Sequence, residues 1–180
     1  MPQYRRSPRA EFLNYDDGCY FVTICTRNRQ HYFGRITNGE MQLSEIGVFI
    51  TEQLIAASDY CSDVAVKSFV VMPNHVHAII CIDRRDVPLA RLKQDSRQRC
   101  PNPSLRGDPT CQRHVPTLSR YISSLKGAVT KFARSHALEF GWQERYHDHL
   151  IRGNHDGKLI MEYISRNVDE WQKDCLYNQP

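Results

Sequence analysis

The sequence has no CxxC pair and no apolar run long enough to cross a membrane. Its seven cysteines are scattered and odd in number, which fits a reduced, intracellular protein and disfavours a cysteine-based zinc site. Cys25 and Cys81 lie in apolar, strand-like runs, where we expect free thiols that pack as small hydrophobic side chains. The N-terminus is polar and basic, without an apolar signal core. We therefore expect a cytoplasmic protein with no membrane partner.

Unusual composition and internal repeats are also absent. The 180 residues are 41% hydrophobic and 24% charged, which predicts a single domain, residues 1–180, with enough apolar material for a core. The net charge of +4 allows a polyanionic partner without requiring one. Residues 1–17 are interpreted as a basic N-terminal arm. Residues 83–116 contain five prolines and no clear periodicity, and are interpreted as a long surface insertion.

Hydrophobic patterning predicts alternating strands and helices along the rest of the chain. We expect a strand from Cys19, a turn at Asn38-Gly39 between short strands, and a helix capped by Ser44. Further strands are expected at 64–72 and 75–82, a helix from 117, a short strand in "YHDHLI", and a last helix over 155–171. That helix would have Leu159, Ile160, Tyr163 and Ile164 on its inner side. This order favours an α+β, ferredoxin-like sandwich with a central antiparallel sheet.

A pair of histidines lies in the apolar stretch "KSFVVMPNHVHAII". Because alternate residues of a strand face the same side, His75 and His77 project together while Val76 faces the core. Two imidazoles on one strand are suited to binding a cation, although each histidine could instead be structural. A third ligand from His147 or His149 would favour zinc, whereas an amide or carboxylate oxygen would favour magnesium or manganese.

The last helix offers a second pair of side chains. Tyr163 and Asn167 are four residues apart and so lie one above the other on a helix face. An amide oxygen from Asn167 could join the imidazoles at a cation, with the Tyr163 phenol beside it. A helical tyrosine beside Ile164 is more often a core residue, and the spacing alone does not overturn that interpretation.

Several motifs occur together in one order: "YFVTICTRNR", "MQLSEIG", "FVVMPNHVHAII", "SLKGAVTKF", "WQERYHDHLIR" and "YISRN". In this respect the chain resembles the REP-associated tyrosine transposases, single-tyrosine members of the HUH family of single-strand DNA nucleases. The resemblance implies a ferredoxin-like fold with the HUH strand, which carries His75 and His77, at the centre of the sheet. It also implies that Tyr163 is the nucleophile, that His75, His77 and Asn167 bind Mg²⁺ or Mn²⁺, and that Val168 stands where the family usually has proline.

The resemblance further implies a partner and a reaction. The partner would be single-stranded DNA with a palindromic repeat folded as a hairpin, cleaved through a covalent 5′-phosphotyrosine link that a 3′-hydroxyl can attack. We expect phosphate contacts from Arg5, Arg6, Arg9, Arg27 and Arg29, and base stacking by Tyr4 and Tyr20. His147, His149 and Lys158 are near the tyrosine in sequence, but none is identified as its base. A monomer and a homodimer both remain compatible with the sequence.

Two other functions compete with this one. A zinc-dependent hydrolase would use His75, His77 and either His147 or His149. A non-catalytic module that binds single-stranded nucleic acid would keep the histidines as structural residues. Tyr146, in "ERYHDH", is a rival nucleophile that has no amide four residues later on a helix.

Overall fold

The computed structural model describes residues 18–61, 63–82 and 117–178 of the chain. The expected arm at 1–17 and insertion at 83–116 lie outside the described residues, as do Tyr4, Arg5, Arg6 and Arg9. Among the helices of the described ranges, none is both long and apolar enough to cross a membrane.

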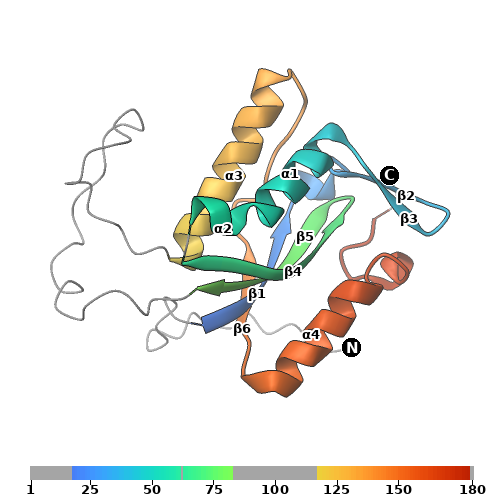
Figure 1. The fold of residues 1–180 in the computed structure, drawn as a ribbon. Helices are drawn as coiled ribbons and strands as arrows, with labels where there is room; N and C mark the ends of the chain where they lie inside the picture. Colours follow the sequence, from blue (N-terminus) through green and yellow to red (C-terminus); the bar gives the residue numbers. More distant parts are fainter. Residues whose placement is uncertain (1–17, 62, 83–116, 179–180) are drawn as a thin grey trace, which may run out of the picture.

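Four antiparallel strands form the main sheet, in the order β4-β5-β1-β6 (Figure 1). Their bounds are Gly18–Cys25 for β1, Val64–Met72 for β4, His75–Ile82 for β5 and His147–Leu150 for β6. Strand β5 lies inside the sheet, between β1 and β4. The histidine pair therefore lies on an interior strand, as predicted.

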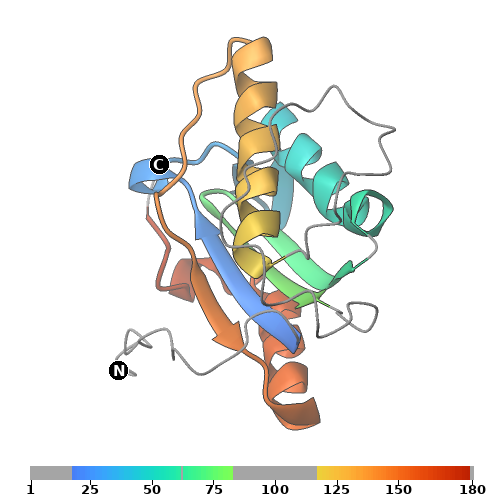
Figure 2. The same cartoon turned by 90° about the vertical axis from the view of Figure 1, so that its left-hand side faces the viewer.

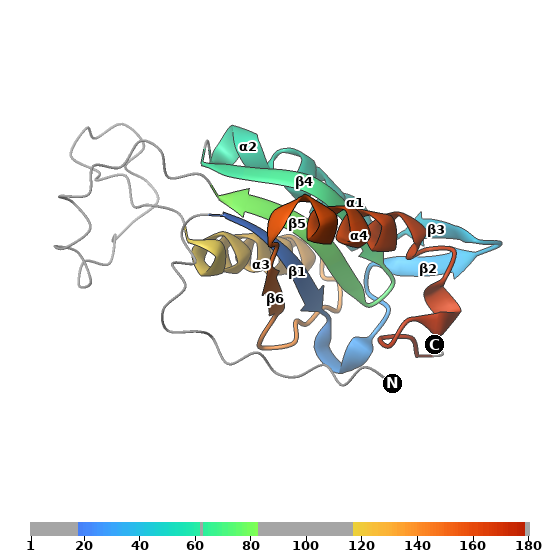
Figure 3. The same cartoon turned by 90° about the horizontal axis from the view of Figure 1, so that it is seen from below.

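Helices cover both faces of this sheet (Figures 2 and 3). The first face is covered by α1, Glu45–Ile55, and α3, Leu118–Ser135, whose buried residues share one core with alternate residues of β1 and β5. Helix α4, Gly153–Arg166, lies against the opposite face. The chain order β-α-β-β-α-β of β1, α1, β4, β5, α3 and β6 is that of a ferredoxin-like unit, with α4 added. The expected α+β fold with a central antiparallel sheet is confirmed.

Local sequence signals account for most element boundaries. The Ser44 hydroxyl accepts a hydrogen bond from the Gly47 amide at the start of α1, as an N-cap does. A second, two-stranded sheet joins β2, Gly34–Thr37, to β3, Glu40–Leu43. Its turn residues, Asn38 and Gly39, have φ of 56° and 79°, the positive values that a tight hairpin of this kind needs.

The last helix departs from its expected bounds. It ends at Arg166 rather than at Trp171, and the chain continues through a turn into a short 3₁₀ segment, η3, Trp171–Lys173. The chain turns back here because Trp171 is buried and packs against the His75 ring. The prediction of which residues lie on the inner side of α4 is also partly wrong. Ile164 is buried, but Leu159 is 54% exposed and Tyr163 is 42% exposed.

The cysteine prediction needs one correction. Cys19 and Cys81 are direct partners across β1 and β5, and a disulfide joins them, so Cys81 is not a free thiol. Strand register is the reason, since it brings together two side chains separated by 62 positions in the sequence. Cys25 is free and buried, as expected.

Candidate active site

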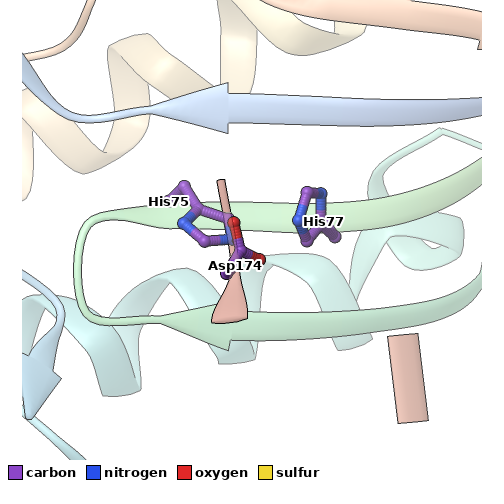
Figure 4. Close-up of side chains that lie close together, drawn as sticks. All are labelled: His75, His77 and Asp174. Carbon is purple, nitrogen blue, oxygen red and sulfur yellow. The ribbon is translucent and has the colours of Figure 1, made fainter. Parts of the chain in front are cut away.

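His75 and His77 lie directly after the tight turn between β4 and β5, on the sheet face opposite the main core (Figure 4). Both are buried, and their ring centroids are 4.4 Å apart. Val76, between them, is fully buried in the core on the other face. The predicted side-by-side arrangement of the two imidazoles is therefore present.

Each imidazole is held through its Nδ1 atom. His75 Nδ1 lies 2.7 Å from Asn74 Oδ1, and His77 Nδ1 lies 2.8 Å from Thr23 Oγ1. Both Nε2 atoms face the side of the tyrosine helix. His77 Nε2 lies 3.2 Å from the Tyr163 hydroxyl oxygen.

Helix α4 brings Tyr163 to this face of the sheet, with Asn167 at its C-terminal end. Phe21 of β1 stacks on the His77 ring and meets the Tyr163 ring edge-on, so it packs between the sheet and the helix. Asn167 is 3% exposed and lies on the same side of the helix as Tyr163. The structure thus brings all four residues expected from the sequence, His75, His77, Tyr163 and Asn167, to one place.

Asp174 is a further member of the site that the sequence analysis missed. Its Oδ2 atom lies 3.2 Å from Tyr163 OH, 3.1 Å from Asn167 Nδ2 and 3.9 Å from His75 Nε2. His75, His77 and Asp174 are the one group of three His, Cys, Asp or Glu side chains in the described part of the chain with ligand atoms within 4.8 Å (Figure 4). No periodicity marks this aspartate, because a turn rather than a regular element positions it.

The segment after η3 is held by polar contacts on both sides. The Leu176 amide donates to Asp174 Oδ1 over 2.7 Å, and Asn74 Nδ2 donates to the Leu176 carbonyl over 2.9 Å. The exposed Arg29 guanidinium donates to the Cys175 carbonyl over 3.3 Å. Arg29, expected to contact DNA, therefore also anchors the chain that carries Asp174.

Burial sets the protonation of the site. It lowers the pKa of both His75 and His77, and for His75 the neighbouring imidazole lowers it further. Burial also raises the pKa of Tyr163, and the neighbouring Asp174 carboxylate raises it further. Burial by itself would raise the pKa of Asp174, but the Leu176 amide, His75 and Asn167 together hold it below its usual value. At neutral pH the imidazoles and the phenol are neutral, and Asp174 is ionised.

Several other expected site residues lie elsewhere. His147 and His149 are on edge strand β6, and His149 Nε2 pairs with Asp156 Oδ2 at 2.9 Å, so neither belongs to the ligand group above. The Tyr146 hydroxyl bonds to Ser119 Oγ. Tyr20 is 1% exposed and part of the core, which excludes the expected stacking on bases.

An open hollow of about 300 Å³ lies along α4 and η3 beside these groups. Tyr163, Asn167 and Asp174 line it, together with the basic side chains of Arg166 and Lys173. The exposed part of Tyr163 can therefore be reached by a ligand from this side. Two glutamates, Glu162 and Glu170, also line the hollow, and Glu162 pairs with Arg166 at 2.8 Å.

The whole chain was compared with protein families, solved structures and curated proteins. No protein-family model matches the chain. The solved structure of a REP-associated tyrosine transposase bound to a REP hairpin shares the fold, with a TM-score of 0.51 and 20% identity over 86% of this chain and 68% of that one. An uncharacterized protein of Haemophilus influenzae Rd is 33% identical over 178 residues, which are 97% of this chain and 93% of that protein. The chain therefore belongs to the same protein family as this Haemophilus influenzae protein.

Proposed function

We propose that this protein is a metal-dependent, single-stranded DNA nuclease and strand transferase whose nucleophile is Tyr163. The observation that carries the proposal is the position of the Tyr163 hydroxyl, 3.2 Å from His77 Nε2, at the edge of a buried histidine pair and facing an open hollow. The fold that this chain shares with a REP-associated tyrosine transposase, at a TM-score of 0.51, is compatible with the same chemistry. The whole chain, residues 1–180, would form one nuclease domain.

The side chains present fit a divalent cation. Within the described residues, His75 Nε2 and Asn167 Oδ1 are buried and have no hydrogen-bond partner. Unpartnered buried polar atoms are costly unless something binds them. Two imidazole nitrogens with an amide oxygen, and the Asp174 carboxylate beside them, form a mixed set suited to Mn²⁺ or Mg²⁺. We propose His75, His77 and Asn167 as ligands, with Asp174 as an additional one.

A bound divalent cation would polarise a non-bridging phosphate oxygen and orient the scissile bond. Tyr163 then attacks phosphorus, so a bond forms from its phenolic oxygen to phosphorus and the bond from phosphorus to the 3′-oxygen breaks. The departing strand takes a proton and leaves as a 3′-hydroxyl, while the 5′-phosphate stays on Tyr163. A second 3′-hydroxyl can then attack this phosphorus, which breaks the bond to the Tyr163 oxygen and joins a new strand.

Asp174 has two consequences for this reaction. Its Oδ2 atom accepts the Tyr163 hydrogen bond, so it is the acceptor already in place for the phenolic proton. It also carries a negative charge where an anionic phosphate would approach the phenol. Substrate entry therefore requires that this charge be neutralised or that the segment holding Asp174 move.

The proposed partner is single-stranded DNA containing a hairpin. The solved transposase structure was obtained with a REP hairpin, and this chain shares its fold. Arg29 is exposed beside the segment that carries Asp174, and Arg27 is exposed and lies against Gly141. We propose that both contact phosphates, together with Arg5, Arg6 and Arg9. Tyr163 lies 3.2 Å from His77 of its own chain, so the tyrosine would act in cis and a monomer would suffice.

The test uses hairpin oligonucleotides from the DNA flanking the gene, incubated with Mn²⁺ or Mg²⁺ and resolved on a denaturing gel. The wild type should give a cleaved strand and a covalent protein–DNA adduct that mass spectrometry maps to Tyr163. Tyr163→Phe and His75→Ala should abolish both, whereas Tyr146→Phe, a matched loss of a phenol away from the site, should leave them intact. Cleavage that persists in Tyr163→Phe without an adduct would exclude this mechanism.

A further inference from the structure

The two histidines are held by partners of different chemistry. His75 Nδ1 meets the side-chain amide of Asn74, whereas His77 Nδ1 meets the hydroxyl of Thr23. Asn74 and Thr23 are 1% and 8% exposed, so both contacts are shielded from water. The histidine tautomers determine which ring nitrogens carry a lone pair for a cation, and these partners determine the tautomers.

The orientation of the Asn74 amide follows from its neighbours. Its nitrogen lies 2.9 Å from the Leu176 carbonyl oxygen and 2.7 Å from Asn178 Oδ1. A carbonyl oxygen accepts but never donates, so the amide nitrogen must face it. Asn74 Oδ1 therefore faces His75, and His75 Nδ1 must carry the hydrogen. In the neutral ring, Nε2 then has a free lone pair directed at the site.

His77 is in a different situation. Tyr163 has one hydroxyl hydrogen, and the ionised Asp174 carboxylate can only accept, so this hydrogen goes to Asp174. The 3.2 Å contact from His77 Nε2 to the Tyr163 oxygen then requires that His77 Nε2 carry a hydrogen. His77 Nδ1 consequently accepts from the Thr23 hydroxyl. In this state His77 has no lone pair available at Nε2.

We propose that Asn74 and Thr23 are positioning residues that control the tautomers of the histidine pair. Asn74 keeps His75 permanently in the form that binds a cation. Thr23 serves His77 in either form, because a hydroxyl can donate to a bare Nδ1 or accept from a protonated one. When a cation enters, His77 loses the Nε2 hydrogen to solvent and takes one up from solvent at Nδ1, so it changes from a donor to Tyr163 into a ligand while Nδ1 keeps its contact with Thr23. This inference rests on the proposed function insofar as it takes the histidine pair to be a cation site.

The first test examines the metal-free, full-length wild type, so it does not depend on any variant folding. Ring ¹⁵N chemical shifts and long-range ¹H–¹⁵N correlations, recorded above pH 7, identify the tautomer of each histidine. His75 should carry its hydrogen on Nδ1 and His77 on Nε2. A His75 hydrogen on Nε2, or the same tautomer at both histidines, would overturn the inference.

The second test measures Mn²⁺ binding by calorimetry. Asn74→Leu and Thr23→Val remove the partners of Nδ1 and should weaken Mn²⁺ affinity about 10- to 100-fold. Thr23→Ser keeps the hydroxyl at His77 Nδ1 and should remain within about threefold of the wild type. Thr130→Val removes a comparable hydroxyl bond on α3, to the Lys126 carbonyl, and should have no effect.

The outcomes separate this inference from the proposed function. Wild-type affinity in correctly folded Asn74→Leu and Thr23→Val would overturn the positioning role even if adducts form on DNA. Wild-type affinity in Thr23→Ser, together with a loss in Thr23→Val and Asn74→Leu, would support it even if no adduct forms, in which case the proposed chemistry alone would fail. Absence of any Mn²⁺ binding by the wild type would overturn the ligand role of both histidines.

Discussion

Four titratable side chains meet at the site, and each changes the proton affinity of the others. Tyr163, His75 and His77 are kept neutral by burial, while Asp174 keeps its charge through hydrogen bonds from the chain around it. At this scale the structure brings together a neutral phenol, two neutral imidazoles and one carboxylate, and the Asp174 carboxylate lies within hydrogen-bonding distance of the Tyr163 hydroxyl. These protonation states lead to two predictions.

Replacing Asp174 with asparagine should lower the pKa of Tyr163. The carboxylate now raises that pKa through its charge and by accepting the phenolic hydrogen bond, and Asn removes the charge while keeping the shape. An ultraviolet titration of the phenolate, with Tyr163→Phe subtracted, would measure the change. Glu170→Gln, which neutralises another acid lining the same hollow, should shift the pKa of Tyr163 less. An unchanged or higher pKa in Asp174→Asn would contradict the prediction.

The metal-free protein should lose stability as the pH falls below 6.5. Both buried histidines have a pKa below the ordinary value of 6.5, so in this range the unfolded chain binds protons that the folded chain does not. Their contribution is fully present above pH 6.5 and decreases toward acid. For one fully shielded histidine the decrease between pH 7 and 5 is about 2 kcal/mol.

Denaturant unfolding across this pH range, with EDTA present, measures the effect. The slope should become shallower in His77→Gln and stay unchanged in His155→Gln, which removes an exposed histidine of α4. Equal slopes in the wild type and His77→Gln would show that His77 is protonated equally readily in the folded and unfolded chain.

At the scale of elements, α1 packs closely against the backbone before β2, a contact that no sequence pattern predicts. Gly47, in the first turn of α1, lies against the Phe33 carbonyl oxygen, and a Cβ there would overlap that oxygen. Gly127, in the middle of α3, has no heavy atom within 4 Å of where a Cβ would lie. The two helical glycines therefore have opposite roles.

Gly47→Ala should destabilise the protein by about 1–3 kcal/mol, because helix and backbone must separate to admit a methyl group. Gly127→Ala should instead stabilise it by roughly 0.5–1 kcal/mol, since alanine loses less conformational entropy in a helix. Chemical denaturation of both variants gives the two values directly. Stabilisation by Gly47→Ala would mean that α1 does not pack closely on the Phe33 carbonyl.

At the scale of the whole molecule, the Cys19–Cys81 disulfide joins the two central strands across 62 positions of sequence. Such a long loop restricts the unfolded chain strongly. Reduction with dithiothreitol should therefore lower the free energy of unfolding by about 2–4 kcal/mol. The Cys19→Ser, Cys81→Ser double variant should be insensitive to the reductant, whereas Cys175→Ser, which replaces an exposed free thiol, should respond as the wild type does. Equal stability of oxidised and reduced wild type would contradict this prediction.

Local patterns were sufficient to predict most elements. Alternation placed His75 and His77 on one face of an interior strand, Asn38-Gly39 predicted the turn between β2 and β3, and Ser44 predicted the start of α1. The same patterns were wrong where a tertiary contact outweighed them. Helix α4 stops at Arg166 because Trp171 folds back to bury itself beside His75. Tyr20 lies in the core, where it cannot stack on DNA bases as expected.

The sequence by itself determined the element order, the shared face of the two histidines and the shared helix face of Tyr163 and Asn167, because local periodicity of two to four residues sets each of them. The tertiary structure decided the rest of the site. Asp174 reaches Tyr163 through a turn, Thr23 reaches His77 through the pairing of β1 with β5, and Leu176 orients Asn74 across more than 100 positions. These contacts depend on strand register and chain reversal, which are set by burial of distant side chains and leave no period in the sequence.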